Sequence, residues 1–305
     1  MTLRQLLDRF ATEEACKVYL VQKRWPDGII RCPRCGNEKV FHVTHRPFHW
    51  VCKSGKTVDG NTCHKRNGYR FSVISKTIFE NTNYPLREWF KVAFLMFNSK
   101  KGMSAHQIHR MLGTGSYETA WFMCHRLRAA MRGSVIPPLG SDGSPVEVDE
   151  TYIGGKNKFR HGNKKHGRRA YGGHDKVPVI GAIARKGNVI CQALEEVGFD
   201  TYERFVKQAV SSKARLLATD EHSGYRHLSK RSYEHWTVNH SEKQYVVGTV
   251  HTNTIESFWS LLKRGIIGSY HHVNREYLPL YLNEFSFRFN NRKNEEIFEE
   301  LMAGC

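Results

Sequence analysis

The chain has 305 residues, with 47 Lys and Arg against 29 Asp and Glu and a net charge of +18. This length can bury a substantial core and suggests about two domains. The large positive excess favours a polyanionic partner such as nucleic acid, and a need for solubility alone accounts poorly for it.

The sequence argues against membrane-spanning and secreted proteins. It has no run of about 18 apolar residues, the length that a transmembrane helix requires. Its first 25 residues lack the apolar core of a signal peptide and include acidic side chains. Eight cysteines without an export signal argue against a disulfide framework. We therefore expect a cytoplasmic protein that has no membrane partner.

The amino-acid composition of the N-terminal part of the chain changes at about residue 28. Residues 1–27 predict two short helices, which begin after the capping residues Thr2 and Thr12. Residues 28–75 are instead rich in Cys, His, Gly and basic side chains. This composition is typical of a small metal-stabilised module rather than of a large apolar core.

The cysteines of this second segment have the spacing of a zinc site. The sequence RCPRCG places Cys32 and Cys35 in a tight turn that points both thiolates towards one metal. Cys52 and either Cys63 or His64 are the candidates for the other two ligands, and we expect the four-cysteine set. The alternative is that these are incidental thiols. Because four protein ligands leave no open position on the ion, the predicted Zn²⁺ has a structural role in a zinc ribbon.

Helical periodicity returns over residues 84–132. Ser104 and Gln107 resemble a capping box, and the residues from Gly113 to Ser116 end one helix and begin the next. This pattern predicts a helix-turn-helix-like region whose second helix enters the major groove of DNA. An ordinary helical hairpin is the alternative, and the basic charge of the chain favours DNA. The candidates for DNA contact on the second helix are Arg126, Arg128 and Arg132.

The remaining chain predicts a linker and an α/β domain. Residues 133–145 are rich in Pro and Gly and mark the main domain boundary. Residues 146–290 follow the order strand, strand, strand, helix, strand, helix, which predicts one mixed sheet. Residues 291–305 are expected to form a C-terminal tail. Within the α/β domain, residues 156–176 hold eight Lys or Arg and one acid, and this basic loop is expected to contact phosphates through Lys164, Lys165, Arg168 and Arg169.

Two acidic residues lie on predicted strands of this domain. Asp149 lies within the predicted strand VEVDETY, whose residues Val146 and Val148 are apolar, and Asp220 ends the apolar run ARLLATD. A buried carboxylate needs compensation, either from loop amides or from a cation. With Glu256 from a later helix they form an oxygen-rich site suited to Mg²⁺ or Mn²⁺. Lys263 follows Glu256 by seven residues and so lies on nearly the same helix face.

Several neighbouring residues compete for these assignments. Glu147 shares the face of Asp149 and is the alternative candidate for the first acid. Glu150 and Glu221 each follow a proposed ligand directly, so their side chains are expected on the opposite face, in a supporting or exposed position. Asn253 and Glu256 together resemble a capping box, which gives Glu256 a purely structural alternative role.

The order of these elements resembles the ribonuclease H-like core of DDE transposases and retroviral integrases. More narrowly, a group of bacterial insertion-sequence transposases with an N-terminal zinc ribbon is similar in four segments: VDETYIGGK, ATDEHSGY, HTNTIESFWSLLKRG and YLNEFSFRFNNR. The resemblance implies that Asp149, Asp220 and Glu256 bind two Mg²⁺ or Mn²⁺ ions, and that Lys263 is the associated basic residue. Since some members carry Asn in place of the third acid, Asn253 remains an alternative at that position.

The resemblance also implies the fold and the function. We expect a multidomain protein in which a small zinc ribbon and a helix-turn-helix-like region precede an α/β ribonuclease H-like domain. Such a protein binds double-stranded DNA at terminal inverted repeats, cleaves it and transfers strands, as a homodimer or larger assembly. Arg264 is a further candidate for DNA contact. The alternatives are a metal-dependent nuclease or resolvase on the same core, and a catalytically inactive zinc-ribbon regulator.

Overall fold

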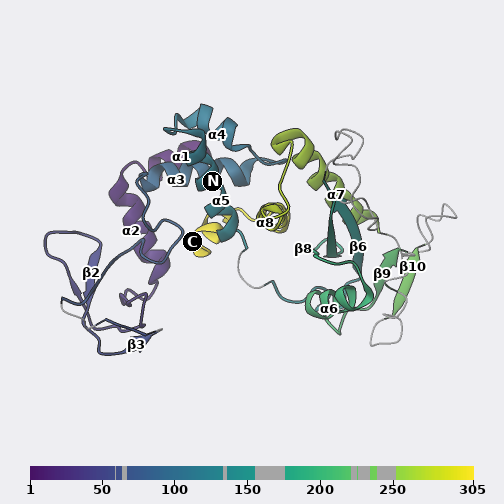
Figure 1. The fold of residues 1–305 in the computed structure, drawn as a ribbon, viewed down its shortest axis with the longest axis horizontal. Coiled ribbons are helices and arrows are strands. Elements are labelled where there is room, and N and C mark those ends of the chain that lie inside the picture. Colours follow the sequence, from purple (N-terminus) through teal and green to yellow (C-terminus); the bar gives the residue numbers. More distant parts are fainter. Residues whose placement is uncertain are drawn as a thin grey trace, which may run out of the picture. The chain divides into compact units, whose positions relative to one another are not determined.

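A computed structural model shows that the chain folds into two compact units (Figure 1). The structure describes residues 1–58, 60–63, 67–132, 136–154, 176–220, 225, 234–238 and 252–305. The first unit comprises Met1–Asn98, Ala105–Gly133 and Asn294–Cys305, and the second comprises Ser99–Ser104 and Ser134–Lys293. The change of unit after Gly133 falls inside the segment that the sequence predicts as a linker.

The first unit is mainly helical. Its helices are α1 (Leu3–Arg9), α2 (Glu13–Arg24), α3 (Leu86–Asn98), α4 (Ala105–Leu112), α5 (Tyr117–Ala130) and α9 (Ile297–Ala303). Polar caps set the starts of α1 and α2: Thr2 forms a capping box with Gln5, and the hydroxyl of Thr12 accepts a hydrogen bond from the amide of Ala15. Ser116 caps α5 in the same way. The capping roles predicted for these residues are therefore confirmed.

The last helix, α9, belongs to the core of the first unit. The ring of Phe298 lies 5.6 Å from that of Phe10 and 5.4 Å from that of Phe90, measured between centroids. Glu299 beside it accepts hydrogen bonds from Arg9 and from the hydroxyl of Tyr19. The predicted C-terminal tail is therefore wrong for these residues, because the short apolar stripe of α9 completes an aromatic cluster.

Short antiparallel strands make up the ribbon region of this unit. Strands β1 (Val40–His42), β2 (His49–Cys52) and β5 (Tyr69–Ser72) form one sheet in the order β1-β2-β5. Strands β3 (Thr57–Val58) and β4 (Asn61–Thr62) form a second, two-stranded sheet. Trp50 and Phe71 are the buried aromatic residues of the larger sheet and stack with their centroids 5.8 Å apart.

The second unit contains a mixed sheet, as the sequence predicts, and this sheet has five described strands. Its strands are β6 (Val146–Ile153), β7 (Val177–Ala184), β8 (Val189–Ala193), β9 (Leu217–Asp220) and β10 (His235–Val238), in the order β10-β9-β6-β7-β8. Strands β6, β7 and β8 pair antiparallel, whereas β9 is parallel to both β6 and β10. The four-residue strand β10 was not predicted.

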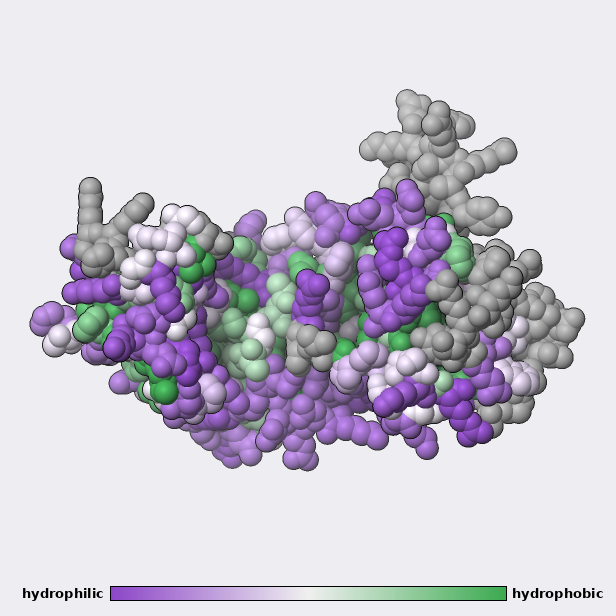
Figure 2. Space-filling model, turned by 90° about the horizontal axis from the view of Figure 1, so that it is seen from below, coloured by the Kyte–Doolittle hydropathy of each residue, from purple (hydrophilic) through white to green (hydrophobic). Residues whose placement is uncertain are grey.

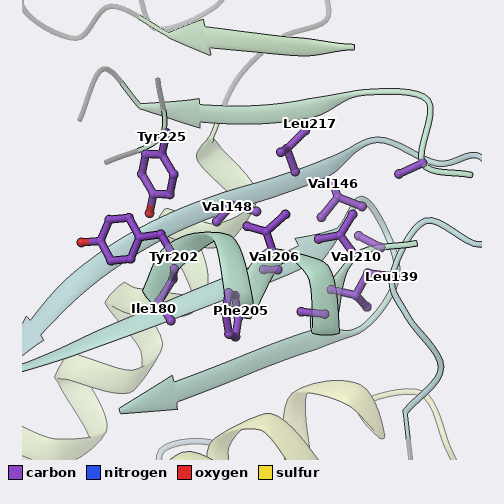
Figure 3. Close-up of a cluster of buried hydrophobic side chains, with 14 of the residues drawn as sticks. Leu139, Val146, Val148, Ile180, Tyr202, Phe205, Val206, Val210, Leu217 and Tyr225 are labelled. Atoms are coloured by element: carbon purple, nitrogen blue, oxygen red, sulfur yellow. The ribbon is translucent and has the colours of Figure 1, made fainter. Parts of the chain in front are cut away.

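Helices cover both faces of this sheet (Figure 1). On one face α6 (Phe199–Ala209) packs Tyr202, Phe205 and Val206 against strand residues such as Val146 and Val148 (Figure 3). The other face carries α7 (Asn253–Gly265) and α8 (Leu278–Asn290), which are separated by a π-helical turn, Ile266–Tyr270. Because strand side chains alternate between faces, neighbouring residues of β6 enter different cores.

One face of the molecule shows a largely polar surface (Figure 2). Hydrophilic residues cover most of the face drawn in Figure 2, and hydrophobic residues gather there only in limited areas. In the part of the chain that the structure describes, no helix combines the length and the apolar character needed to cross a membrane.

Candidate active site

Strands β6 and β9 bring two of the predicted catalytic acids together. The two strands run parallel, and Glu147 is paired with Ala218. Continuing that register by two residues places Asp149 next to Asp220, which ends β9. Carboxylate oxygens of Asp149, Asp220 and Glu150 all lie within 4.8 Å of one another. We refer to these three residues as the carboxylate cluster.

Burial and like charge alter the chemistry of Asp149. Burial raises the pKa of its carboxyl to about 7, with further contributions from the negative charges of Asp220 and Glu150. The indole nitrogen of Trp259 donates a hydrogen bond of 3.0 Å to Asp149 Oδ2 and opposes this shift. A cation placed among the three carboxylates would offset their repulsion.

The carboxylate cluster fits a hard divalent cation. Mg²⁺ prefers oxygen ligands at about 2.1 Å in octahedral geometry, which places opposite ligands about 4.2 Å apart. The oxygen separations of the cluster, all within 4.8 Å, are compatible with one shared ion. When bound, such an ion would be held by Asp149 and Asp220, with Glu150 in reach of it.

Glu150 is the member of the cluster that the sequence analysis placed on the opposite face of the strand, in a supporting or exposed position, and not among the metal ligands. Its neighbour Val148 enters the core on the α6 face, as alternation predicts, yet the Glu150 carboxylate still comes close to Asp149 and Asp220. Tyr225 donates a 2.6 Å hydrogen bond to Glu150 Oε2 and is itself fully buried against Tyr202 (Figure 3). The adjacent acids of the DET triplet were the available signal for this arrangement.

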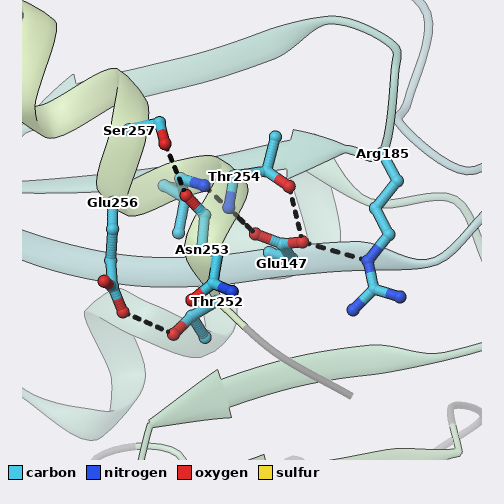
Figure 4. Close-up of polar contacts among 8 residues, drawn as sticks. Glu147, Arg185, Thr252, Asn253, Thr254, Glu256 and Ser257 are labelled. Carbon is cyan, nitrogen blue, oxygen red and sulfur yellow. Dashed lines mark hydrogen bonds and ion pairs between the residues drawn. The ribbon is translucent and has the colours of Figure 1, made fainter. Parts of the chain in front are cut away.

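The third predicted acid lies on α7, outside the cluster. Among the described residues, the group of acids close enough to share an ion does not include Glu256. Glu256 is exposed and accepts a 2.8 Å hydrogen bond from Thr252 Oγ1 (Figure 4). Trp259, which contacts Asp149, follows Glu256 by one helical turn. Asn253 and Lys263 are exposed at the start and near the end of the same helix.

Glu147, the alternative first acid, is engaged by other groups. Its side chain is fully buried, and Oε2 accepts hydrogen bonds from the amides of Thr254 (2.9 Å) and Ile255 (3.1 Å). Oε1 accepts from Thr254 Oγ1 (2.8 Å) and Arg185 Nε (3.0 Å) (Figure 4). Its oxygens are therefore committed to protein donors. The predicted capping box of Asn253 and Glu256 is wrong, because Asn253 is the first residue inside α7 and the residue at the N-cap position is Thr252, whose hydroxyl donates to Glu256.

The ribbon cysteines form a second cluster suited to a metal. The sulfur atoms of Cys32 and Cys63 are 3.9 Å apart and those of Cys35 and Cys52 are 3.7 Å apart, and all four lie within 4.8 Å of one another. Tetrahedral zinc with bonds of about 2.3 Å separates its sulfur ligands by about 3.8 Å. The four thiols therefore fit structural zinc, with Cys63 as the fourth member. His64, the alternative, lies outside the described residues.

The arginines predicted to contact DNA differ in their surroundings. Arg126 is half-buried and donates to the carbonyls of Ile78 (2.6 Å) and Glu80 (2.8 Å). Arg128 is only 1% exposed, so the prediction that it contacts DNA is wrong for this structure. Arg132 and Arg264 are exposed. The predicted basic-loop contacts, Lys164, Lys165, Arg168 and Arg169, lie outside the described residues.

Comparison with known proteins identifies two domains, and both are domains of transposases. Residues 141–290 match the family model of the ISXO2-like transposase domain, and residues 11–72 match that of the transposase zinc-ribbon domain. A protein described as "Uncharacterized protein in transposable element ISH50" of Halobacterium salinarum is 28% identical over 304 residues, covering 92% of this chain and 91% of its own length. The chain thus belongs to the insertion-sequence transposases that carry an N-terminal zinc ribbon and a DDE-type transposase domain.

Proposed function

We propose that the protein binds the terminal inverted repeats of its own insertion sequence and catalyses metal-dependent DNA cleavage and strand transfer. The observation that carries this proposal is the carboxylate cluster, in which two strand acids of the transposase domain meet at one point of the sheet. The sheet supports a ribonuclease H-like core, because three antiparallel strands are followed by two parallel ones on the other side of β6.

In this proposal Asp149 and Asp220 hold the catalytic cations, and Glu256 completes the set from α7. Two divalent ions, when bound, activate the attacking oxygen and stabilise the leaving oxygen of a phosphodiester. Burial keeps the carboxylate of Asp149 poorly solvated, which favours its pairing with a cation. Lys263, which is exposed near the end of α7, contacts a DNA phosphate in this proposal. Asn253 stays the alternative for the third position, and Glu150 is a candidate ligand beside Asp149.

The first unit supplies DNA recognition in this proposal. A zinc ion held by Cys32, Cys35, Cys52 and Cys63 stabilises the ribbon. The α4–α5 pair acts as a helix-turn-helix, with Arg132 among its exposed basic residues. The basic residues 156–176 and Arg264 contact phosphates, so DNA binding weakens as salt increases. Since two element ends must be joined, we expect a homodimer or larger assembly on DNA.

A strand-transfer assay on labelled DNA that carries both ends of the element tests the proposal. The wild-type protein should cut the ends in Mg²⁺ and join them to a target molecule, whereas Asp149→Ala and Asp220→Ala should do neither. Cleavage without joining would instead support the nuclease or resolvase. Tight DNA binding with no cleavage in any divalent metal would support the inactive regulator.

A further inference from the structure

Burial of a charged carboxylate such as that of Glu147 is energetically unfavourable unless other groups compensate its charge. Its side chain is fully buried, and its carboxylate meets a cation, Arg185, and the positive end of α7. A carboxylate that accepts amides at a helix N-terminus is stabilised both by the hydrogen bonds and by the helix dipole. Thr252, the residue before α7, makes no side-chain cap, so a strand side chain performs this function from 107 residues away.

A second hydrogen bond joins β6 and α7 at a neighbouring position along both elements. Asp149 follows Glu147 by two residues, so both side chains emerge on the same face of β6. Asp149 accepts the indole hydrogen of Trp259, which follows Ile255 by four residues on α7. Two strand residues advance about 6.6 Å, and four helical residues advance about 6 Å. The two contacts therefore fit one register of α7 along β6.

Glu256 lies between these two contacts in the sequence of α7. Its backbone position is fixed by Ile255 on one side and by Trp259 on the other. Sliding α7 by a single residue would break both contacts and would turn Glu256 by about 100° around the helix axis. We propose that Glu147 is a positioning residue, which holds α7 in the register that presents Glu256 to the metal ions at Asp149 and Asp220. This inference rests on the proposed function of that site.

A purely structural role for Glu147 makes a different prediction from a positioning role. Loss of a buried ion pair destabilises a protein wherever the pair is found. A positioning role adds weaker metal binding, since residues that orient the ligands of a metal commonly change its affinity about 10- to 100-fold. The unit contains a matched control for this comparison. Glu284 is also fully buried and pairs with Arg288, but it contacts Tyr270 in the turn after α7 rather than the start of α7.

The test compares Glu147→Gln with Glu284→Gln in the full chain. Mn²⁺ binding is measured by the spin-resonance signal of the free ion, thermal unfolding is measured in EDTA, and DNA cleavage is measured against Mg²⁺ concentration. We expect both variants to unfold at lower temperature. Only Glu147→Gln should bind Mn²⁺ about tenfold more weakly and need about tenfold more Mg²⁺ for half-maximal cleavage. Amide exchange at Thr254 and Ile255 should also be faster in this variant.

If Glu147→Gln does not fold, Thr254→Val replaces it, because that change removes one hydroxyl contact and preserves the shape of the side chain. A variant that matches wild-type Mn²⁺ affinity, or that matches Glu284→Gln in every measurement, overturns the positioning role. Failure of the wild-type protein itself to bind Mn²⁺ and to cut DNA would overturn the proposed function, so the two failures are distinguishable.

Discussion

At the scale of single residues, Asp149 links the sheet, the neighbouring acids and α7. Burial and the charges of Asp220 and Glu150 raise its pKa to about 7, and the Trp259 indole opposes them. A carboxyl in this environment changes charge near neutral pH, where a surface aspartate is fully ionised. The stability of the metal-free protein and the onset of its activity should therefore both depend on pH through this residue.

The first prediction concerns the stability of the metal-free protein. The pKa of Asp149 is 3.8 for the ordinary group and about 7 in the fold, so between these values the folded state keeps a proton that the unfolded state releases. The free energy of unfolding contributed by Asp149 therefore falls as pH rises through this window and is largest below its lower limit. Thermal unfolding in EDTA between pH 4 and 8 should show this fall, and Asp149→Asn should reduce it. If the stability of Asp149→Asn fell with pH as steeply as that of the wild type, the prediction would be wrong.

The second prediction concerns the hydrogen bond from Trp259. Trp259→Phe keeps a buried ring and removes the donor that lowers the pKa of Asp149. A hydrogen bond to a charged group is worth about 1.5–3 kcal/mol, so the pKa of Asp149 should rise by roughly one to two units. The rising limb of the pH–cleavage profile should move up by about as much. Trp236→Phe is the control, because Trp236 makes a similar bond to Glu234 on the surface. Coincident profiles for both variants and the wild type would rule out this role.

At the scale of elements, the ribbon depends on its cysteine cluster more than on its small core. Strands of two to four residues bury few side chains, of which Trp50 and Phe71 are the largest. Structural zinc contributes folding free energy directly in such modules. The metal, rather than apolar packing, should therefore decide whether this region is folded.

The third prediction follows from that dependence. Cys35→Ser removes one of the four thiols and should lower the zinc content from about one ion per chain to near zero, with loss of DNA binding. Cys191→Ser is the control, because Cys191 lies in the sheet of the other unit, beside Ser286. Zinc is measured by elemental analysis and DNA binding by fluorescence anisotropy. Full zinc content in Cys35→Ser would show that this cysteine is not a ligand.

The packing of α7 on the sheet gives a fourth prediction. Gly181 pairs with Asp149 across β6 and β7, and a Cβ atom at Gly181 would lie 2.7 Å from the Trp259 ring. Gly181→Ala should therefore displace α7, lower the free energy of unfolding by roughly 1–3 kcal/mol and reduce cleavage. Gly268→Ala, where a Cβ meets nothing within 4 Å, should do neither. Denaturant unfolding checks both, and equal stability of the two variants would argue against this packing.

Sequence patterns predicted most of the elements but not the contacts between them. Alternation in VEVDETY and the apolar run before Asp220 identified two strands and the acids that they bring together. The contacts of Glu147 and Trp259 depend on the register between β6 and α7, which are more than 100 residues apart in the chain. No local pattern encodes that register. For Arg128, a positive charge predicted exposure, whereas the core of the first unit surrounds it.

At the scale of the whole molecule, the two units divide the proposed work. The first unit contains the zinc ribbon and would recognise DNA under the proposed function, and the second contains the acids to which that function assigns the chemistry. The net charge of +18 suits a protein that must bind two element ends and a target. The central claim is that Asp149 and Asp220 act by holding divalent metal ions.

Replacing each of these acids by cysteine tests that claim most directly. Thiolates bind Mg²⁺ poorly and bind softer ions better, so a change of ligand should change the metal requirement. The fifth prediction is that Asp149→Cys and Asp220→Cys fail to cut labelled element ends in Mg²⁺ and regain cleavage in Mn²⁺. The corresponding alanine variants should stay inactive in both metals. Wild-type rates of cleavage by the cysteine variants in Mg²⁺ would contradict the account.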